Sequence, residues 1–239
     1  MITAQGGHKE VVEAFLEHEK GMKDNQSHNA LHHALRSGHT EAAKIVIPHE
    51  DPTDENGVTA LMRATARGDA EMVKLLAPLQ KGAKDKDGNT AYTLAARAGQ
   101  GTIVEILDPT DKAGVTALMR AAGRNDVEAV RALMPLQKGK KASYVMINGW
   151  PMSHGTALMR AAALGYVEVV KLLVEHEGGM RASRGYSALM WAAYHGHADC
   201  VKLLLEREGG MQNNDGETAC AIAKRRGHSS VADLLAKYE

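Results

Sequence analysis

Histidine is the residue type with which this sequence could most readily do metal or acid–base chemistry, because it occurs twelve times. Four histidines directly follow a glycine and share one register of a repeated pattern: His8, His39, His197 and His228. A histidine that recurs in register at a turn is typical of a structural role. His28, His32 and His33 also lie close together, but no cysteine or acidic pair at ligand spacing accompanies them. We therefore predict no metal site.

The other candidates for chemistry favour a non-catalytic protein. Cys200 and Cys220 stand where other copies of the pattern carry valine or leucine, which favours small core residues. Two cysteines cannot build a disulfide framework, which indicates a reducing compartment. The sequence Gly-Gln-Gly-Thr at 99–102 resembles a phosphate-binding loop, but it lacks the lysine and lies between two helices. Neither a Gly-x-Ser-x-Gly motif nor a kinase signature occurs, so we expect no enzyme activity and no cofactor.

The overall composition limits the partners of the chain. Lysine plus arginine and aspartate plus glutamate balance at 29 each, so no net charge draws the chain towards nucleic acid or a membrane. Residues 1–9 are polar and glycine-rich, unlike a signal peptide. No apolar run approaches the roughly 20 residues that span a bilayer. We expect a monomeric cytoplasmic protein without membrane contact, and association with the cytoskeleton or the nucleus stays open.

Repeats are the elements that must position these side chains. The phrase Thr-Ala-Leu-Met and its variants recur along the chain, and their alanines align: Ala30, Ala60, Ala91, Ala117, Ala157, Ala188 and Ala219. The spacings between these alanines are 30, 31, 26, 40, 31 and 31 residues. A modal period of 31 with one deletion and one insertion indicates a solenoid, and the aromatic content of 4% fits its thin layers.

Each repeat is predicted to be a pair of helices. A threonine or serine precedes each apolar run and suits a helix N-cap. In one repeat we expect a first helix over 157–164, a stop at Gly165, and a second helix from Val167 that ends at Gly178 and Gly179. One pair cannot bury its own apolar face, so neighbouring pairs must stack into a continuous core.

Two departures from the regular repeat predict local irregularities. Pro78 and Pro135 fall within expected second helices, and we expect them to kink these helices or end them early, because proline lacks an N–H donor. The spacing of 40 hides about nine extra residues near 140–153, among them Tyr144 and Trp150. Apolar residues on a connector leave two alternatives: a finger that contacts a partner, or a strand-like loop folded back on its own helices.

The repeat unit resembles the ankyrin repeat. Residues 185–205, which begin Gly-Tyr-Ser-Ala-Leu-Met-Trp-Ala-Ala, match the ankyrin pattern over their whole length, and the resemblance covers essentially the entire chain. It implies an all-α solenoid of stacked helix-turn-helix units with short hairpin connectors. The expected boundaries are a partial repeat at 1–26, repeats at 27–56, 57–87, 88–113, 114–153, 154–184 and 185–215, and a capping repeat at 216–239.

This version of the repeat departs from the family pattern in two ways. Alanine replaces the usual proline, and methionine usually replaces the usual histidine, so apolar packing by methionine should replace the family's Thr–His hydrogen bonds. The methionines are Met62, Met119, Met159 and Met190. This Thr-Ala-Leu-Met form of the repeat is similar to that of ankyrin proteins from diplomonad protists, some of which carry a NIMA-related kinase domain.

The resemblance also implies a binding surface, because the first helices and hairpin tips of ankyrin proteins form a concave face. The residues at its variable positions are Arg63, Arg67, Arg97, Arg120, Arg124, Arg160, Tyr186, Trp191 and Tyr194. Glutamates lie instead in the second helices: Glu41, Glu71, Glu128 and Glu168. We therefore expect a basic groove that ends in an aromatic patch, with Trp150 of the inserted loop as a further contact. The alternative is that the arginines only solvate the surface and pair with their neighbours.

These features predict a non-catalytic scaffold or adaptor that binds an acidic segment of another protein. One alternative is the regulatory or targeting arm of a NIMA-related kinase whose catalytic domain lies outside this chain. A second is nucleic-acid binding by the arginine row. Zero net charge and the lack of aromatics interleaved along the groove disfavour this second alternative.

Overall fold

The computed structural model describes residues 12, 14, 21–147 and 150–238 of the chain. These residues form fourteen α-helices, which confirms the all-α architecture predicted from the sequence. The chain divides into two compact units, Met1–Leu107 and Asp108–Glu239. No helix within the described part is long and apolar enough to cross a bilayer. Most of the expected partial repeat at 1–26, including His8, lies outside the described residues.

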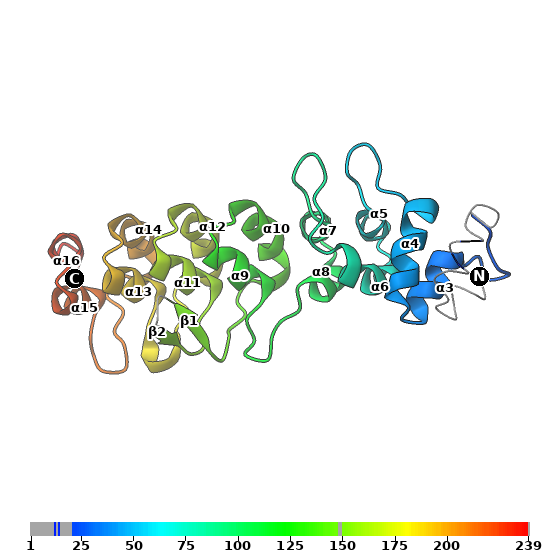
Figure 1. The fold of residues 1–239 in the computed structure, drawn as a ribbon. Coiled ribbons are helices and arrows are strands. Elements are labelled where there is room, and N and C mark those ends of the chain that lie inside the picture. The colour runs from blue at the N-terminus through cyan, green and yellow to red at the C-terminus, as the bar shows by residue number, and fades with distance from the viewer. Residues whose placement is uncertain (1–11, 13, 15–20, 148–149, 239) are drawn as a thin grey trace. The chain divides into compact units, whose positions relative to one another are not determined.

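Within its described residues, the first unit contains three pairs of helices (Figure 1). Their bounds are α3 Ala30–Arg36 with α4 Thr40–Glu50, α5 Ala60–Ala66 with α6 Ala70–Gln80, and α7 Ala91–Arg97 with α8 Gly101–Leu107. Helix α5 stacks on α7 and α6 stacks on α8, while α3 packs against α4 and α6. The deletion predicted from the spacing of 26 falls in α8, which has 7 residues where α6 has 11.

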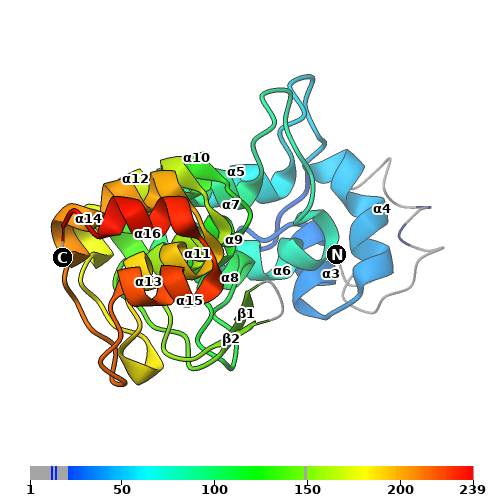
Figure 2. The same ribbon diagram turned by 90° about the vertical axis from the view of Figure 1, so that its left-hand side faces the viewer.

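The described residues of the second unit form four pairs of helices in two layers. The first helices are α9 Ala117–Gly123, α11 Ala157–Leu164, α13 Ala188–His195 and α15 Ala219–Arg226. The second helices are α10 Val127–Gln137, α12 Val167–Glu177, α14 Ala198–Glu208 and α16 Ser229–Leu235. Figures 1 and 2 show the first helices in one layer, the second helices in the other, and the connectors on the side of the first-helix layer. These connectors include β1 Val145–Ile147, β2 Trp150–Met152 and the short helix η1 Ser183–Gly185.

The predicted caps set the bounds of the first helices. The side chains of six residues each accept a hydrogen bond from the backbone N–H three residues later: Thr59, Thr90, Thr116, Thr156, Ser187 and Thr218. Helix α11 ends at Gly165, whose φ of 75° is the left-handed conformation expected there. Local sequence therefore determines where each first helix starts and stops.

The core consists of small and flexible apolar side chains, as predicted. Alanine pairs between neighbouring first helices are fully buried: Ala121, Ala122, Ala161, Ala162, Ala192 and Ala193. Met62, Met119, Met159 and Met190 are buried too, which confirms that they pack in the core. Cys200 and Cys220 are also core residues, and burial raises the pKa of the Cys200 thiol to about 11.

The prediction that Pro78 and Pro135 end their helices early is wrong, and a kink at these residues stays a prediction. Helices α6 and α10 have 11 residues each, the same length as α12 and α14, which contain no proline. Each proline is the third residue from the helix end, so it removes only one late N–H donor. The N–H of the residue that follows each helix, Lys81 or Lys138, still bonds to the carbonyl four residues back, at 3.0 Å in both cases.

In four repeats a hydrogen bond joins the end of the second helix to the start of the first helix. The backbone N–H of Leu189 donates to Oε2 of Glu208 at 2.6 Å, and that of Leu158 donates to Oε2 of Glu177 at 2.7 Å. Gln80 and Gln137 accept in the same way, 19 residues from their donors. Sequence reasoning missed this contact, although an acidic residue or glutamine ends each of these four helices.

The choice of glutamate or glutamine at this position matches the number of N–H groups that it accepts. Glu177 and Glu208 each accept a second N–H with Oε1, from Gly139 at 3.0 Å and from Gly179 at 2.9 Å. These glycines lie two residues after the preceding second helix. The corresponding residues before the two glutamine repeats are Pro52 and Pro109, which have no N–H. A carboxylate therefore occurs where two donors converge, and an amide with one acceptor oxygen suffices where there is one.

The turn histidines have the structural role predicted for them where the structure shows their contacts. Nε2 of His197 lies 3.1 Å from the carbonyl oxygen of Ala163, and Nε2 of His228 lies 3.1 Å from that of Tyr194. In both cases the carbonyl belongs to the preceding repeat. A Cβ on Gly165 would lie only 2.7 Å from Nδ1 of His197, so this turn needs glycine for space as well as for its φ.

Replacing His197 with alanine should lower the free energy of unfolding by about 1 kcal/mol, because the variant loses one hydrogen bond between repeats. Chemical denaturation followed by circular dichroism measures this change. The control is His176→Ala, which removes an exposed histidine of α12. Equal stability of the two variants would contradict the role assigned to the turn.

Candidate functional site

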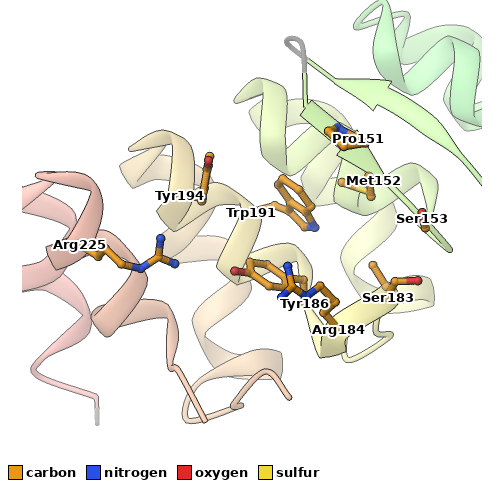
Figure 3. A pocket seen from close by; sticks show the side chains of 10 residues that line it. Pro151, Met152, Ser153, Ser183, Arg184, Tyr186, Trp191, Tyr194 and Arg225 are labelled. Carbon is orange, nitrogen blue, oxygen red and sulfur yellow. The ribbon is translucent and has the colours of Figure 1, made fainter. Parts of the chain in front are cut away.

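The three aromatic residues predicted to bind a partner lie together in the second unit. Trp191 and Tyr194 are on α13, and Tyr186 lies just before it. The Trp191 ring centroid is 5.5 Å from that of Tyr186 and 5.9 Å from that of Tyr194. All three line a pocket of about 470 Å³, here called the aromatic pocket (Figure 3). Its other lining residues are Pro151, Met152, Ser153, Ala182, Ser183, Arg184 and Arg225.

Trp191 carries an unsatisfied hydrogen-bond donor in this pocket. Its side chain is nine-tenths buried, with 9% relative exposure. The indole Nε1–H is buried and has no acceptor among the described residues. Buried tryptophan N–H groups usually find a partner, and a missing one costs about 1–3 kcal/mol. An oxygen acceptor supplied from outside the chain would satisfy the group.

Two arginines line the aromatic pocket, and only one of them pairs with a carboxylate in the described part of the chain. Arg225 of α15 donates from Nε to Oε1 of Glu217 at 2.9 Å. Glu217, and then Tyr186, raise the pKa of Arg225. Arg184 is exposed, and no carboxylate pairs with it in the described part of the chain. Arg184 is therefore the pocket cation that is available to an incoming anion (Figure 3).

Arg184 also has an unusual backbone. Its φ of 62° is in the left-handed region that favours glycine. In the connectors before α5 and α9, Asp54 and Asp111 accept two backbone N–H groups and shape the turn, but Ala182 stands at this position here. Strain of this kind is often retained at functional sites.

A group of arginines lies on the neighbouring first helices α9 and α11. Nε of Arg160 is buried without a hydrogen-bond partner among the described residues. Burial lowers the pKa of Arg160, and the charges of Arg124 and Arg120 lower it further. Its side chain runs over Gly123, where a Cβ would come within 2.3 Å of Nε. Arg124 is exposed. Neither Arg124 nor Arg160 forms an ion pair with a carboxylate in the described structure.

Arg63 and Arg120 are not available in the way expected for a binding groove. Arg63 donates to Oδ1 of Asp51 at 2.7 Å and to the carbonyl of Val58 at 2.8 Å. Arg120 makes the equivalent bonds, to Asp108 at 3.1 Å and to the carbonyl of Val115 at 2.7 Å. For these two residues the structure shows the alternative of pairing with neighbours. They hold the connectors that precede their own helices.

A sequence signal for these pairs exists. Each aspartate directly follows a second helix and precedes its arginine by twelve residues. The residue after the helix that precedes Arg160 is Lys138, which cannot pair with it.

In the first unit, Arg97 donates to Asn89 at 2.6 Å, and Arg67 is exposed.

The inserted segment forms a β-hairpin. Val145 pairs with Met152 in antiparallel register, and β1 contacts α11. Val145 and Met152 are buried, as the alternative of a strand-like loop folded on its own helices requires. Tyr144 and Met146 remain about half exposed, at 49% and 47%. Trp150 lies in β2, and its side chain is outside the described part, so its role in binding stays a prediction.

The histidine cluster near the N-terminus includes an acidic residue that was not among the expected ligands. Asp24 lies next to His28 and His33, and the possible ligand atoms of the three residues all lie within 4.8 Å of one another. It is the one cluster of this kind found in the described part of the chain.

Stacked helix pairs with an exposed layer of variable first helices define a helical repeat protein of the solenoid class. A family model described as ankyrin repeats (3 copies) matches residues 1–56, 48–112, 106–182 and 176–239. The chain therefore belongs to the ankyrin-repeat family. No curated protein matches the chain. Ankyrin repeats generally mediate protein–protein interactions and are typically non-catalytic binding modules.

Proposed function

We propose that this protein is a non-catalytic interaction scaffold that binds an acidic segment of another protein on the first-helix layer of its second unit. One observation carries the proposal. On consecutive first helices, the Nε–H of Arg160 and the Nε1–H of Trp191 are buried and have no acceptor among the described residues. A carboxylate at Arg160 and a carboxylate or carbonyl oxygen at Trp191 would satisfy both.

The repeat geometry suggests the spacing of groups in the partner. Arg160 and Trp191 occupy the same register, three residues after Ala157 and Ala188, on helices that pack together. Packed helices are roughly 8–10 Å apart, and an extended chain advances roughly 3.3 Å per residue. We therefore infer a segment whose acidic residue reaches Arg124 and Arg160 while a residue about three positions away fills the aromatic pocket.

This proposal narrows the expected groove to residues of the second unit. Arg124, Arg160 and Arg184 supply charge, and Trp191 and Tyr194 supply the apolar anchor. Arg, Trp and Tyr are the residue types most often found as interface anchors. A monomer in the cytoplasm fits this role. Nucleic-acid binding and the role of a kinase arm, in a diplomonad-type protein, are the alternative proposals.

Selection from a displayed library of random 12-residue peptides on the immobilised chain tests the proposal. We expect enriched peptides to contain Asp or Glu near an aromatic or aliphatic residue. Synthetic versions with Asn or Gln in place of the acids should bind at least ~10-fold more weakly, because hydrogen bonds to charged groups contribute about 1.5–3 kcal/mol. Equal affinity of acidic and amide versions would contradict the proposal. Strong salt-dependent binding of mixed RNA or DNA would favour the nucleic-acid alternative instead.

Arg184→Gly separates binding from stability. Glycine adopts a positive φ without the cost of about 1 kcal/mol that arginine bears, so the variant should be as stable as the wild type or more so. Its affinity for a selected acidic peptide should nevertheless fall by ~5-fold or more, because a pocket cation is lost. Fluorescence anisotropy and thermal unfolding measure the two effects. Unchanged affinity would show that Arg184 does not contribute to peptide binding.

A further inference from the structure

A second candidate site lies in the first unit, where the connector before α3 meets that helix. Nε2 of His33 is 2.8 Å from Oδ2 of Asp24, and Nδ1 of His28 is 3.7 Å from the same oxygen. Two imidazoles and one carboxylate therefore converge on one point. This ligand set suits Zn²⁺ and related ions, which bind these groups at about 2.0–2.2 Å and often leave one position to water.

Hydrogen bonds within the connector hold the Asp24 carboxylate in place. Oδ1 of Asp24 accepts the backbone N–H groups of Gln26 at 2.8 Å and His28 at 2.9 Å. Asp54 holds its own connector with two equivalent bonds. The fold thus fixes Oδ1 and leaves Oδ2 for other contacts. The backbone N–H of His28, with smaller contributions from Gln26 and His33, holds the pKa of Asp24 at about 2, so the carboxylate is ionised at neutral pH.

The two histidines stand at positions that vary between repeats. His28 corresponds to Val58 and His33 corresponds to Arg63, counting from the aligned alanines. Arg63 forms ion pairs with Asp51 and lies 3.9 Å from Asp54. A contact between His33 and Asp24 alone would resemble this structural pairing. The addition of His28 supplies a third ligand, which the other repeat lacks.

A neighbouring buried histidine points independently to a ligand. The ring of His28 stacks on that of His32, with centroids 3.8 Å apart and an interplanar angle of 3°. His32 is more than nine-tenths buried, and its Nδ1 has no hydrogen-bond partner in the described part. Both rings line a pocket of about 340 Å³, together with Asp69 and Glu71 at the start of α6. Burial, followed by the charge of His28, lowers the pKa of His32.

We propose that Asp24, His28 and His33 form a binding site for one divalent transition-metal ion, with Zn²⁺ as the ion that they fit best. The ion ties the connector to α3 and replaces the arginine-to-aspartate pairing of the next repeat. Binding only to the folded state would stabilise the first unit by linkage.

Calorimetric titration of the metal-free full chain with Zn²⁺ tests this proposal, and Co²⁺ absorption reports the coordination. The test variant is His28→Val/His33→Arg, which installs the residues of the next repeat and so keeps a pairing for Asp24. The control is His176→Ala, which removes an exposed histidine in the second unit. Circular dichroism of the metal-free proteins checks that each variant keeps its helix content. The single variant His28→Val, which keeps the contact of His33 with Asp24, is used if the double variant loses helix.

We expect one Zn²⁺ per wild-type chain and per control chain. In the test variant the affinity should fall by more than the ~10–100-fold that outer-shell changes cause. Zn²⁺ should also raise the unfolding temperature of the wild type and the control, but not of the test variant. Equal binding by test variant and wild type, loss of binding in the control, or no stoichiometric binding by the wild type would each overturn the proposal.

Discussion

Replacing Glu208 with alanine should lower the free energy of unfolding by about 2–4 kcal/mol. Glu208 has 1% relative exposure, and its carboxylate accepts the N–H of Leu189 at 2.6 Å and that of Gly179 at 2.9 Å. Its loss would leave both donors without an acceptor, and each buried unpaired group costs about 1–3 kcal/mol. The effect is large because one side chain joins the start of its own repeat to the connector before it.

Urea denaturation of the full chain measures this effect, with Glu206→Ala as the matched control. Glu206 is on the same helix but is exposed, so its removal should change stability by less than about 0.5 kcal/mol. Glu208→Gln should fall between wild type and alanine, because the amide keeps one acceptor but turns an NH₂ group towards another donor. Similar stability of the Glu206 and Glu208 alanine variants would show that the hydrogen bonds of Glu208 do not stabilise the fold.

The double variant Arg124→Glu/Arg160→Met should weaken binding of a selected acidic peptide by about 100-fold, which corresponds to about 2.7 kcal/mol. The variant removes one charge-assisted donor and turns an attractive charge into a repulsive one. Its unfolding free energy should stay within about 1 kcal/mol of wild type or rise, because Arg160 is a partly buried charge without a carboxylate partner in the described structure.

Arg131→Glu is the control for this loss of binding. It reverses an exposed arginine on α10, in the second-helix layer, and should leave the affinity unchanged. Charge reversal at Arg63 or Arg120 is a poorer test, because it would also break the connectors that these residues hold through Asp51 and Asp108. Equal losses from Arg131→Glu and the double variant would mean that binding depends on overall charge and not on the proposed surface.

The helices and the core could be predicted from the sequence because local chemistry fixes them. Thr156 caps α11 and Gly165 ends it within a span of ten residues, so the repeated phrase alone locates this helix. The buried methionines followed from the same register. The prediction that Pro78 ends its helix early failed because the effect of this proline depends on its distance from the helix end, which the pattern did not reveal.

The contacts that decide function needed the three-dimensional structure. Sequence reasoning placed Arg63 and Arg160 in equivalent positions, but only Arg63 has an aspartate at the connector before it. The sequence did not reveal Asp24 as a ligand because it has no acidic partner at ligand spacing, whereas in the structure one carboxylate and two histidines meet. The aromatic patch was predicted from register, but the unsatisfied Nε1–H of Trp191 appears only once the helices are packed.

The indole N–H signal of Trp191 in a ¹H–¹⁵N correlation spectrum, assigned with a Trp150→Phe variant, tests the binding surface most directly. Titration with a selected acidic peptide should move this signal downfield as the group gains an acceptor, and the amide version of the peptide should move it far less at equal concentration. A Trp191 signal that stays in place while the peptide saturates the protein would contradict the proposed binding surface.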